Sequence, residues 1–192
     1  ERSLHAAWAA DRGPADLPQD REPAFAMGRA TSEFRAIAGN RATMLPEDDS
    51  AIDDMIAHID AAQDHVHVLF YIWLPDHSGT RMAEAIMAAS RRGVATRVLV
   101  DDLGSRRLIR SDLWRRMQAA GVTCAVALPI GNPLIELLYK RLDLRNHRKI
   151  VVVDNAVSWA GSRNCSDAAF AIKPRFAPWV DILMRVEGPV VR

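Results

Sequence analysis

The stretch that decides the fold is "RNHRKIVVVDNAVSWAGSRN", residues 145–164, in which polar side chains surround two apolar runs. The runs "HRKIVVVD" and "AVSWAG" predict a β-hairpin that turns at Asp154 and Asn155. In an extended strand His147, Lys149 and the valines at the following alternate positions share one face. A histidine and a lysine that precede buried valines on the same face indicate that this end of the strand borders a site.

The residues around this strand extend the pattern. Asp154 has the opposite parity and sits at the turn, so we expect it to hold the hairpin rather than touch a substrate. Gly161 allows close backbone approach, which would place Ser162 and Asn164 beside the strand of His147. Histidine, lysine and amide donors without grouped carboxylates predict an anion site, most simply for phosphate, and argue against a divalent metal. The alternative is a solvated strand end, and strand parity alone does not favour either the anion site or this alternative.

Helices and strands alternate upstream of the hairpin. Helices are predicted over residues 50–63, 80–93, 111–121 and 133–142, and strands over residues 41–45, 65–73, 94–102, 122–128 and 179–188. This alternation predicts an α/β fold of layered α/β/α type with a mostly parallel, mixed sheet. Residues 1–38 carry prolines and scattered charges without a period, so we interpret them as a linker or irregular arm with a short helix over 32–38. Residues 39–192 then form one domain.

Composition excludes several classes of protein. The chain has 192 residues, 49% hydrophobic and 26% charged, which is typical of a globular domain with a real core. It contains no run of about 18 apolar residues that would span a bilayer, and its N-terminus does not resemble a signal peptide. Because the chain starts at Glu1, we expect a segment upstream of it. Two cysteines are too few for a disulfide framework or a zinc site and favour a reducing compartment.

Three further groups of residues lie near predicted strand ends. Tyr71 and Trp73 share a face of one strand and could line a lipid channel, although core packing is an equal alternative. Asp101, Asp102 and the following "LGS" close the next strand, either in a loop near the site or in a turn that leads into a helix. A basic stretch could meet anionic headgroups or nucleic acid, but such runs are more often a solvated helix face. It comprises Arg106, Arg107, Arg110, Arg115 and Arg116.

One spacing pattern in the hairpin resembles the HKD motif of the phospholipase D superfamily: His147-x-Lys149-x4-Asp154-x6-Gly161-Ser162-x-Asn164. The segments "FYIW", "RRGVATRVLVDDLGS", "AAGV", "DLRNHRKIVVVD" and "APWVDILMRVEGPVV" are further similar to bacterial cardiolipin synthases. This similarity extends from about Gly39 to the C-terminus. The chain therefore resembles the N-terminal half of such an enzyme, and the resemblance implies a phospholipase D-type domain.

The resemblance also implies an activity. Enzymes of this kind are phosphatidyltransferases that join two phosphatidylglycerols and release glycerol through a phosphohistidine intermediate, without a metal or another cofactor. His147 would be one of two catalytic histidines, and Lys149 and Asn164 would hold the phosphate with support from Ser162. Asp181 in "PWVDILM" matches a carboxylate that opens the next strand in relatives, and we expect it to orient His147.

Two of these assignments have alternatives. A structural link from Asp181 to Arg185 would give that carboxylate a purely structural role. Asp154 belongs to the motif by spacing, and it is therefore kept among the candidate catalytic residues although its parity favours a role in the hairpin.

The superfamily site is built from two HKD motifs, and this chain carries one. The other half could lie on a separate chain or be lost, the chain could pair with itself, or it could be catalytically inactive. The similarity to two-motif enzymes favours a fragment. The expected partners are anionic phospholipid, above all phosphatidylglycerol, a membrane surface and a second HKD half, at the cytoplasmic face of a bacterial inner membrane. Nucleic acid is not expected.

Two rival functions remain open. The first is a hydrolase of the same chemistry, either a phospholipase or a nuclease that acts as a homodimer. The second is a non-catalytic domain that binds anionic lipid.

Overall fold

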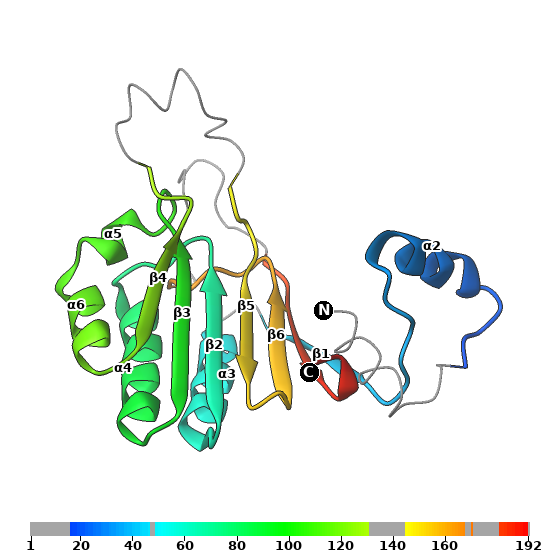
Figure 1. Cartoon of the computed structure of the whole chain (residues 1–192), viewed down its shortest axis with the longest axis horizontal. Coiled ribbons are helices and arrows are strands. Elements are labelled where there is room, and N and C mark those ends of the chain that lie inside the picture. The colour runs from blue at the N-terminus through cyan, green and yellow to red at the C-terminus, as the bar shows by residue number, and fades with distance from the viewer. Residues whose placement is uncertain (1–15, 47–48, 131–144, 168–169, 171–180, 192) are drawn as a thin grey trace.

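A computed structural model describes residues 16–46, 49–130, 145–167, 170 and 181–191. Seven strands form one sheet in the order β1-β7-β6-β5-β2-β3-β4 (Figure 1). The strands are β1 (Arg41–Leu45), β2 (His65–Phe70), β3 (Ala95–Asp101), β4 (Thr123–Ala127), β5 (Ile150–Val153), β6 (Val157–Gly161) and β7 (Leu183–Glu187). The helices are α2 (Glu22–Ser32), α3 (Ser50–Ala61), α4 (His77–Arg91), α5 (Arg106–Ile109), α6 (Asp112–Ala119) and the 3-10 helix η2 (Pro189–Val191).

The sheet is mixed, and the α/β class is confirmed. β2, β3 and β4 pair in parallel, since α4 connects β2 to β3 and α6 connects β3 to β4. The other four pairs are antiparallel. The expectation of a mostly parallel sheet is therefore wrong. β5 and β6 form the predicted hairpin, β7 pairs with β6, and β1 pairs with β7 at the end of the sheet order.

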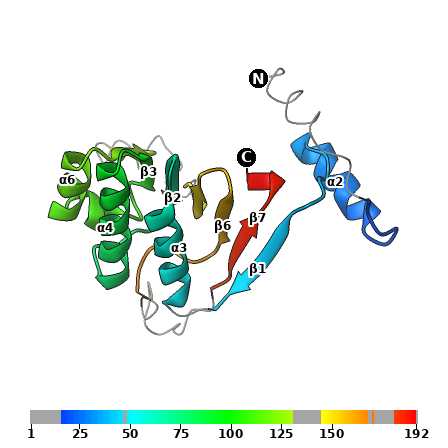
Figure 2. The same ribbon diagram turned by 90° about the horizontal axis from the view of Figure 1, so that it is seen from below.

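The core lies between the sheet and helices α3, α4 and α6, which pack side by side on one face (Figure 2). Val66, Val68 and Phe70 of β2 are buried on this face, as are Val151 and Val153 of β5. Alternate residues of these strands lie on the opposite face, where no described helix covers them. The helix predicted over 133–142 lies outside the described residues. None of the described helices is long and apolar enough to cross a bilayer.

The N-terminal helix differs from the prediction. A helix forms at α2, ten residues before the expected 32–38 helix, because Pro23 favours the first helical turn and Glu33 ends it in the left-handed region at φ 64°. No residue of α2 is buried, and Figures 1 and 2 show it apart from the sheet.

The topology brings one set of strand ends together. The carboxyl ends of β2, β3, β4 and β6 meet the amino ends of β5 and β7 at one edge of the sheet, which we call the site edge. It carries Tyr71 after β2, Asp101 at the end of β3, Leu128 after β4, Lys149 before β5 and Asn164 after β6.

The turn between β5 and β6 lies at the opposite edge. Asp154 and Asn155 both have positive φ, 53° and 51°, and the turn is closed by a hydrogen bond of 3.0 Å from Ala156 N to Val153 O.

Candidate active site

Tyr71 contacts both leading residues of the motif. Its ring centroid lies 4.1 Å from that of the His147 imidazole, with the two planes inclined by 51°. The Nζ of Lys149 lies 5.5 Å from the Tyr71 centroid and donates a hydrogen bond of 2.7 Å to the backbone oxygen of His147. The imidazole and the ammonium are thus held against one aromatic ring at the site edge.

Lys149 occupies a partly desolvated position. Burial lowers the pKa of its ammonium from the ordinary value, and the nearby carboxylate of Asp181 opposes the shift only in part. A cation with less water around it interacts more strongly with an anion than one in bulk solvent does. Lys149 is therefore well placed to bind a phosphate, but its ammonium loses its proton at a lower pH than that of an ordinary lysine.

The amide of Asn164 is oriented by the loop that follows β2. Its Oδ1 accepts a hydrogen bond of 3.2 Å from the backbone N–H of Ile72. The chain around it is held by two backbone bonds, from Cys165 N to Ile72 O (3.1 Å) and from Leu74 N to Cys165 O (3.0 Å). With its oxygen occupied, the amide has its NH₂ group left to donate to a ligand. Asn164 therefore joins the site edge next to Tyr71.

Ser162 and Asp181 form a pair of their own. The Ser162 hydroxyl donates to Asp181 at 2.7 Å and accepts from Ile182 N at 2.9 Å. Among the described residues no hydrogen bond joins Asp181 to the imidazole of His147, so the orienting contact is not made in this structure. The alternative link to Arg185 is not made in this part of the chain either, since Arg185 pairs with Asp54 at 2.8 Å.

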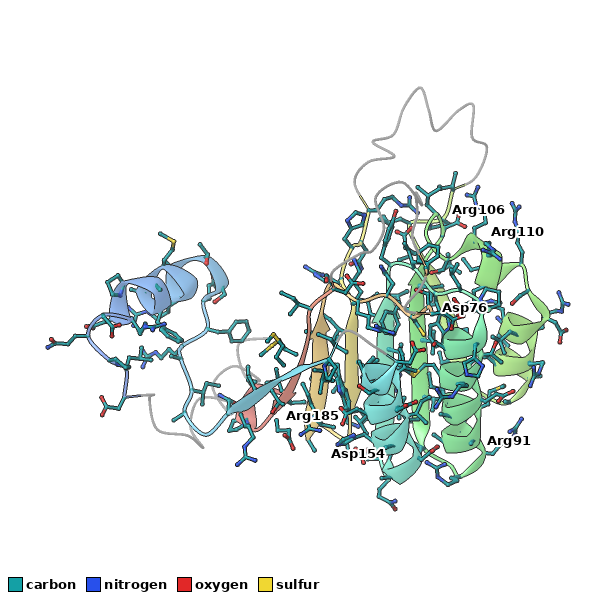
Figure 3. The ribbon with its side chains drawn as sticks, turned by 180° about the vertical axis from the view of Figure 1, so that it is seen from behind. Asp76, Arg91, Arg106, Arg110, Asp154 and Arg185 are labelled. Carbon is teal, nitrogen blue, oxygen red and sulfur yellow. The ribbon has the colours of Figure 1, made fainter. Side chains whose placement is uncertain are left out.

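Asp154 lies at the opposite edge of the sheet from the site (Figure 3). Its carboxylate accepts hydrogen bonds of 2.8–2.9 Å from the backbone N–H groups of Gln63, Asp64 and His65. Burial raises the pKa of Asp154, but these three amides and the charge of His65 outweigh burial, and its pKa is lowered. Asp154 ties the hairpin turn to the loop before β2 and does not touch the site, so its inclusion among the catalytic residues is wrong.

Tyr71 and Trp73, the two aromatic candidates for a lipid channel, lie in different environments. Trp73 is fully buried and donates its Nε1–H to the carbonyl of Gly79 at 3.0 Å, so it is a core residue and its proposed role in a channel is wrong. Tyr71 is partly exposed and contacts His147. Burial raises the pKa of the Tyr71 phenol, and the charge of Asp101 raises it further.

A buried ion pair between Arg145 and Asp101, which the sequence did not suggest, holds the segment that precedes His147 in place. Arg145 donates to Oδ1 of Asp101 through Nη2 (2.9 Å) and Nε (3.1 Å), and its Nη2 also reaches the carbonyl of Leu128 at 2.9 Å. Both side chains are buried, with exposures of 6% for Arg145 and 0% for Asp101. The same Asp101 oxygen accepts from the backbone N–H groups of Leu103 and Gly104. Asp101 therefore both forms the turn after β3 and anchors the segment before His147.

His147 opens onto a cleft of about 600 Å³. Its described lining residues are Leu128, Arg145, Asn146, His147 and Arg148. Leu128 adopts a positive φ of 50°, a conformation that a leucine rarely takes and that the surrounding contacts must maintain. The cleft has the size of a small-molecule site. Among its described lining residues, His147 is the side chain that can act as a nucleophile, and cationic and amide groups lie beside it.

This arrangement can perform half of a phosphoryl transfer. An imidazole can attack phosphorus or transfer a proton, and an ammonium with an amide can stabilise charge on the phosphoryl oxygens. The fold and the site edge together define an α/β domain of the phospholipase D type.

Comparisons with known proteins agree with this class. A family profile described as "Cardiolipin synthase, PLD-like domain" matches residues 55–174. Cardiolipin synthase A of Edwardsiella ictaluri is 34% identical over 169 residues, which are 88% of this chain and 34% of that protein. Cardiolipin synthase A of Yersinia pestis gives the same figures. The chain belongs to the cardiolipin synthase family of phospholipase D-like domains, and it spans about a third of the length of these relatives.

Solved structures show the same fold at low sequence identity. Nuc from Salmonella typhimurium, a phospholipase D family member, is 18% identical with a TM-score of 0.51, over 80% of this chain and 86% of that one. NucT from Helicobacter pylori is 18% identical with a TM-score of 0.52, over 79% of this chain and 87% of that one.

Proposed function

We propose that this chain supplies one HKD half-site of a phosphatidyltransferase of cardiolipin synthase type, which joins two phosphatidylglycerols and releases glycerol. One observation carries the proposal. His147 and Lys149 both contact the ring of Tyr71, and His147 lines a cleft, in a chain that is 34% identical to curated cardiolipin synthases. Asn164 adds an oriented amide at the same edge of the sheet.

In the first step the His147 imidazole attacks the phosphorus of a phosphatidylglycerol. A P–N bond forms, the P–O bond to the headgroup glycerol breaks, and a second histidine protonates the leaving alkoxide. Lys149 and the Asn164 amide stabilise the charge that develops on the non-bridging oxygens. In the second step the hydroxyl of another phosphatidylglycerol loses its proton to the second histidine and attacks phosphorus. The P–N bond then breaks and cardiolipin leaves.

The second histidine belongs to another HKD half. It could come from the remainder of a longer protein, from a separate chain or from a second copy of this one. In each case the half-site described above acts at a membrane surface, because both substrates are lipids, and we place it at the cytoplasmic face.

Half-site chemistry can be tested without turnover. Vanadate adopts the trigonal-bipyramidal geometry of a phosphoryl group in transfer, so we expect it to shift the side-chain NMR signals of His147. The exposed His77 in the first turn of α4 is the matched control and should not move. Lys149→Ala should weaken the shift. A vanadate titration that leaves His147 unperturbed would contradict the proposal.

A further inference from the structure

Three arginines without ion pairs among the described residues lie at the site edge, and one of them, Arg148, lines the cleft. Arg107 of α5, Arg110 directly after α5 and Arg148 before β5 are exposed, and none of the three has an ion pair within the described chain. Arg106 differs, since it lies 3.7 Å from Asp102. Within the part of the chain that the structure describes, no carboxylate neutralises these guanidinium groups, and they give the site edge a positive surface.

Two leucines accompany the arginines. Leu103, in the turn after β3, is 44% exposed, and Leu128, after β4, is 49% exposed. The two loops are joined by a hydrogen bond from Asp102 N to Ala127 O of 3.1 Å. Single exposed leucines are ordinary on a protein surface, but two on adjacent loops beside free cations make an amphipathic surface.

The whole surface faces the same way as the active site. α5 follows β3 directly, and Leu128 and Arg148 both line the cleft of His147. Figure 3 shows Arg106 and Arg110 at this end of the sheet and Arg91 at the other end.

We propose that this surface docks the domain on a bilayer of anionic phospholipid and turns the cleft toward the headgroups. We call it the arginine rim, and it consists of Leu103, Arg107, Arg110, Leu128 and Arg148. Arginines at a membrane surface are attracted by anionic lipid, and partly exposed leucines gain by entering the interfacial layer. The inference rests on the proposed function, because a lipid substrate must reach His147 from a membrane.

The other arginines of the basic stretch are excluded from the rim by their contacts. Arg115 pairs with Asp112 at 3.1 Å, and Arg116 pairs with Glu84 at 3.5 Å. Their charge is compensated on the protein surface, which leaves less of it to attract lipid. The same arginines would also bind the phosphates of a nucleic acid, but the exposed leucines would contribute little to such binding.

The test is co-sedimentation of the full 192-residue chain with vesicles, either of phosphatidylcholine alone or of phosphatidylcholine with one-quarter phosphatidylglycerol. We expect binding to the anionic vesicles only, and weaker binding as salt rises. Arg110→Gln should weaken binding about fivefold, and Arg107→Gln with Arg110→Gln about 25-fold, since each arginine near the surface contributes about fivefold. Leu103→Ser should weaken it as well. Arg91→Gln, an exposed arginine at the opposite edge, is the matched control and should bind like the unaltered chain.

Three results would overturn the arginine rim. If Arg91→Gln and Arg110→Gln weakened vesicle binding equally, the protein would be attracted to anionic lipid by its overall charge and not through a defined surface. Tighter binding of single-stranded DNA than of vesicles, lost in the Arg107 and Arg110 variants, would assign the surface to nucleic acid. The vanadate titration of His147 separates this test from the proposed function. The Leu103, Arg107 and Arg110 variants lie outside the described lining of the cleft and should leave that titration unchanged. Unaltered vesicle binding in these variants, together with a normal titration, rejects the rim and leaves the proposed function in place.

Discussion

The ring of Tyr71 lies 4.1 Å from the imidazole of His147, at the point where β2 ends and the segment before β5 passes it. The same ring lies beneath the ammonium of Lys149. One residue outside the HKD motif therefore positions both residues that begin it.

Replacing Tyr71 should test this positioning. Tyr71→Ala removes the ring from both neighbours, and we expect sulfate affinity to fall about two- to fivefold, the usual size of an exposed cation–π contact. The side-chain NMR signals of His147 should also shift, because Tyr71→Ala removes the ring that lies 4.1 Å from the imidazole. Tyr71→Phe keeps the ring and should restore both properties. If Tyr71→Phe behaves like Tyr71→Ala, the hydroxyl matters rather than the ring.

The buried pair of Asp101 and Arg145 should matter mainly to stability. Arg145→Ala leaves a fully buried carboxylate without its cation, and we expect a loss of about 3–5 kcal/mol in the free energy of unfolding, measured in urea. Arg115→Ala, which removes one side of an exposed pair, should cost at most about 1 kcal/mol. Similar losses for the two variants would mean that the buried pair does not anchor the motif.

The lowered pKa of Lys149 predicts a pH dependence of anion binding. Sulfate keeps its charge across the alkaline range, so any loss of affinity there reports on the protein. As pH rises through the lowered pKa, Lys149 loses its proton and sulfate affinity should fall, at a lower pH than for an ordinary lysine. Lys149→Arg keeps its charge and should move the fall to higher pH. An identical pH profile for the two proteins would assign the effect to another group.

Asp154 should contribute to stability in a pH-dependent way. Its pKa is lowered in the folded state, so its contribution is complete above the ordinary carboxyl pKa and disappears as pH falls through the lowered value. Asp154→Asn suits the left-handed turn but removes the charge, so it should lower the urea midpoint at pH 7 and flatten the loss of stability in acid. Anion binding at the distant site should not change. A weaker sulfate affinity in this variant would contradict the structural role.

Much of the fold was predictable because the signals are local. Helical spacing predicted α3, α4 and α6, and runs of β-branched residues predicted β2, β3 and β4. The parity of Asp154 against His147 correctly separated the turn from the site. Pairings over long distances carry no such signal, so the sheet was expected to be more parallel than it is, and β1 beside β7 could not be foreseen.

Residues of the candidate site could be predicted where strand alternation relates them to one another. Beyond the end of a strand, alternation carries no such information. β2 stops at Phe70, so alternation no longer relates Tyr71 to Trp73, and the first contacts His147 while the second enters the core. The partner of Arg145 lies 44 residues away at the end of another strand. In the sequence this arginine is indistinguishable from the solvated charges around it.

The most direct test of the account is the covalent adduct on His147. The chain is incubated with phosphatidylglycerol, alone and together with a second HKD half, quenched in alkali and digested for mass spectrometry. We expect on the imidazole of His147 a phosphatidyl group, or the glycerophosphoryl group that remains when alkali cleaves its acyl esters. Acid should remove this group and alkali should preserve its P–N bond, and it should be absent from His147→Ala and present in His77→Ala. No adduct under either pairing, or an adduct on another residue, would contradict it.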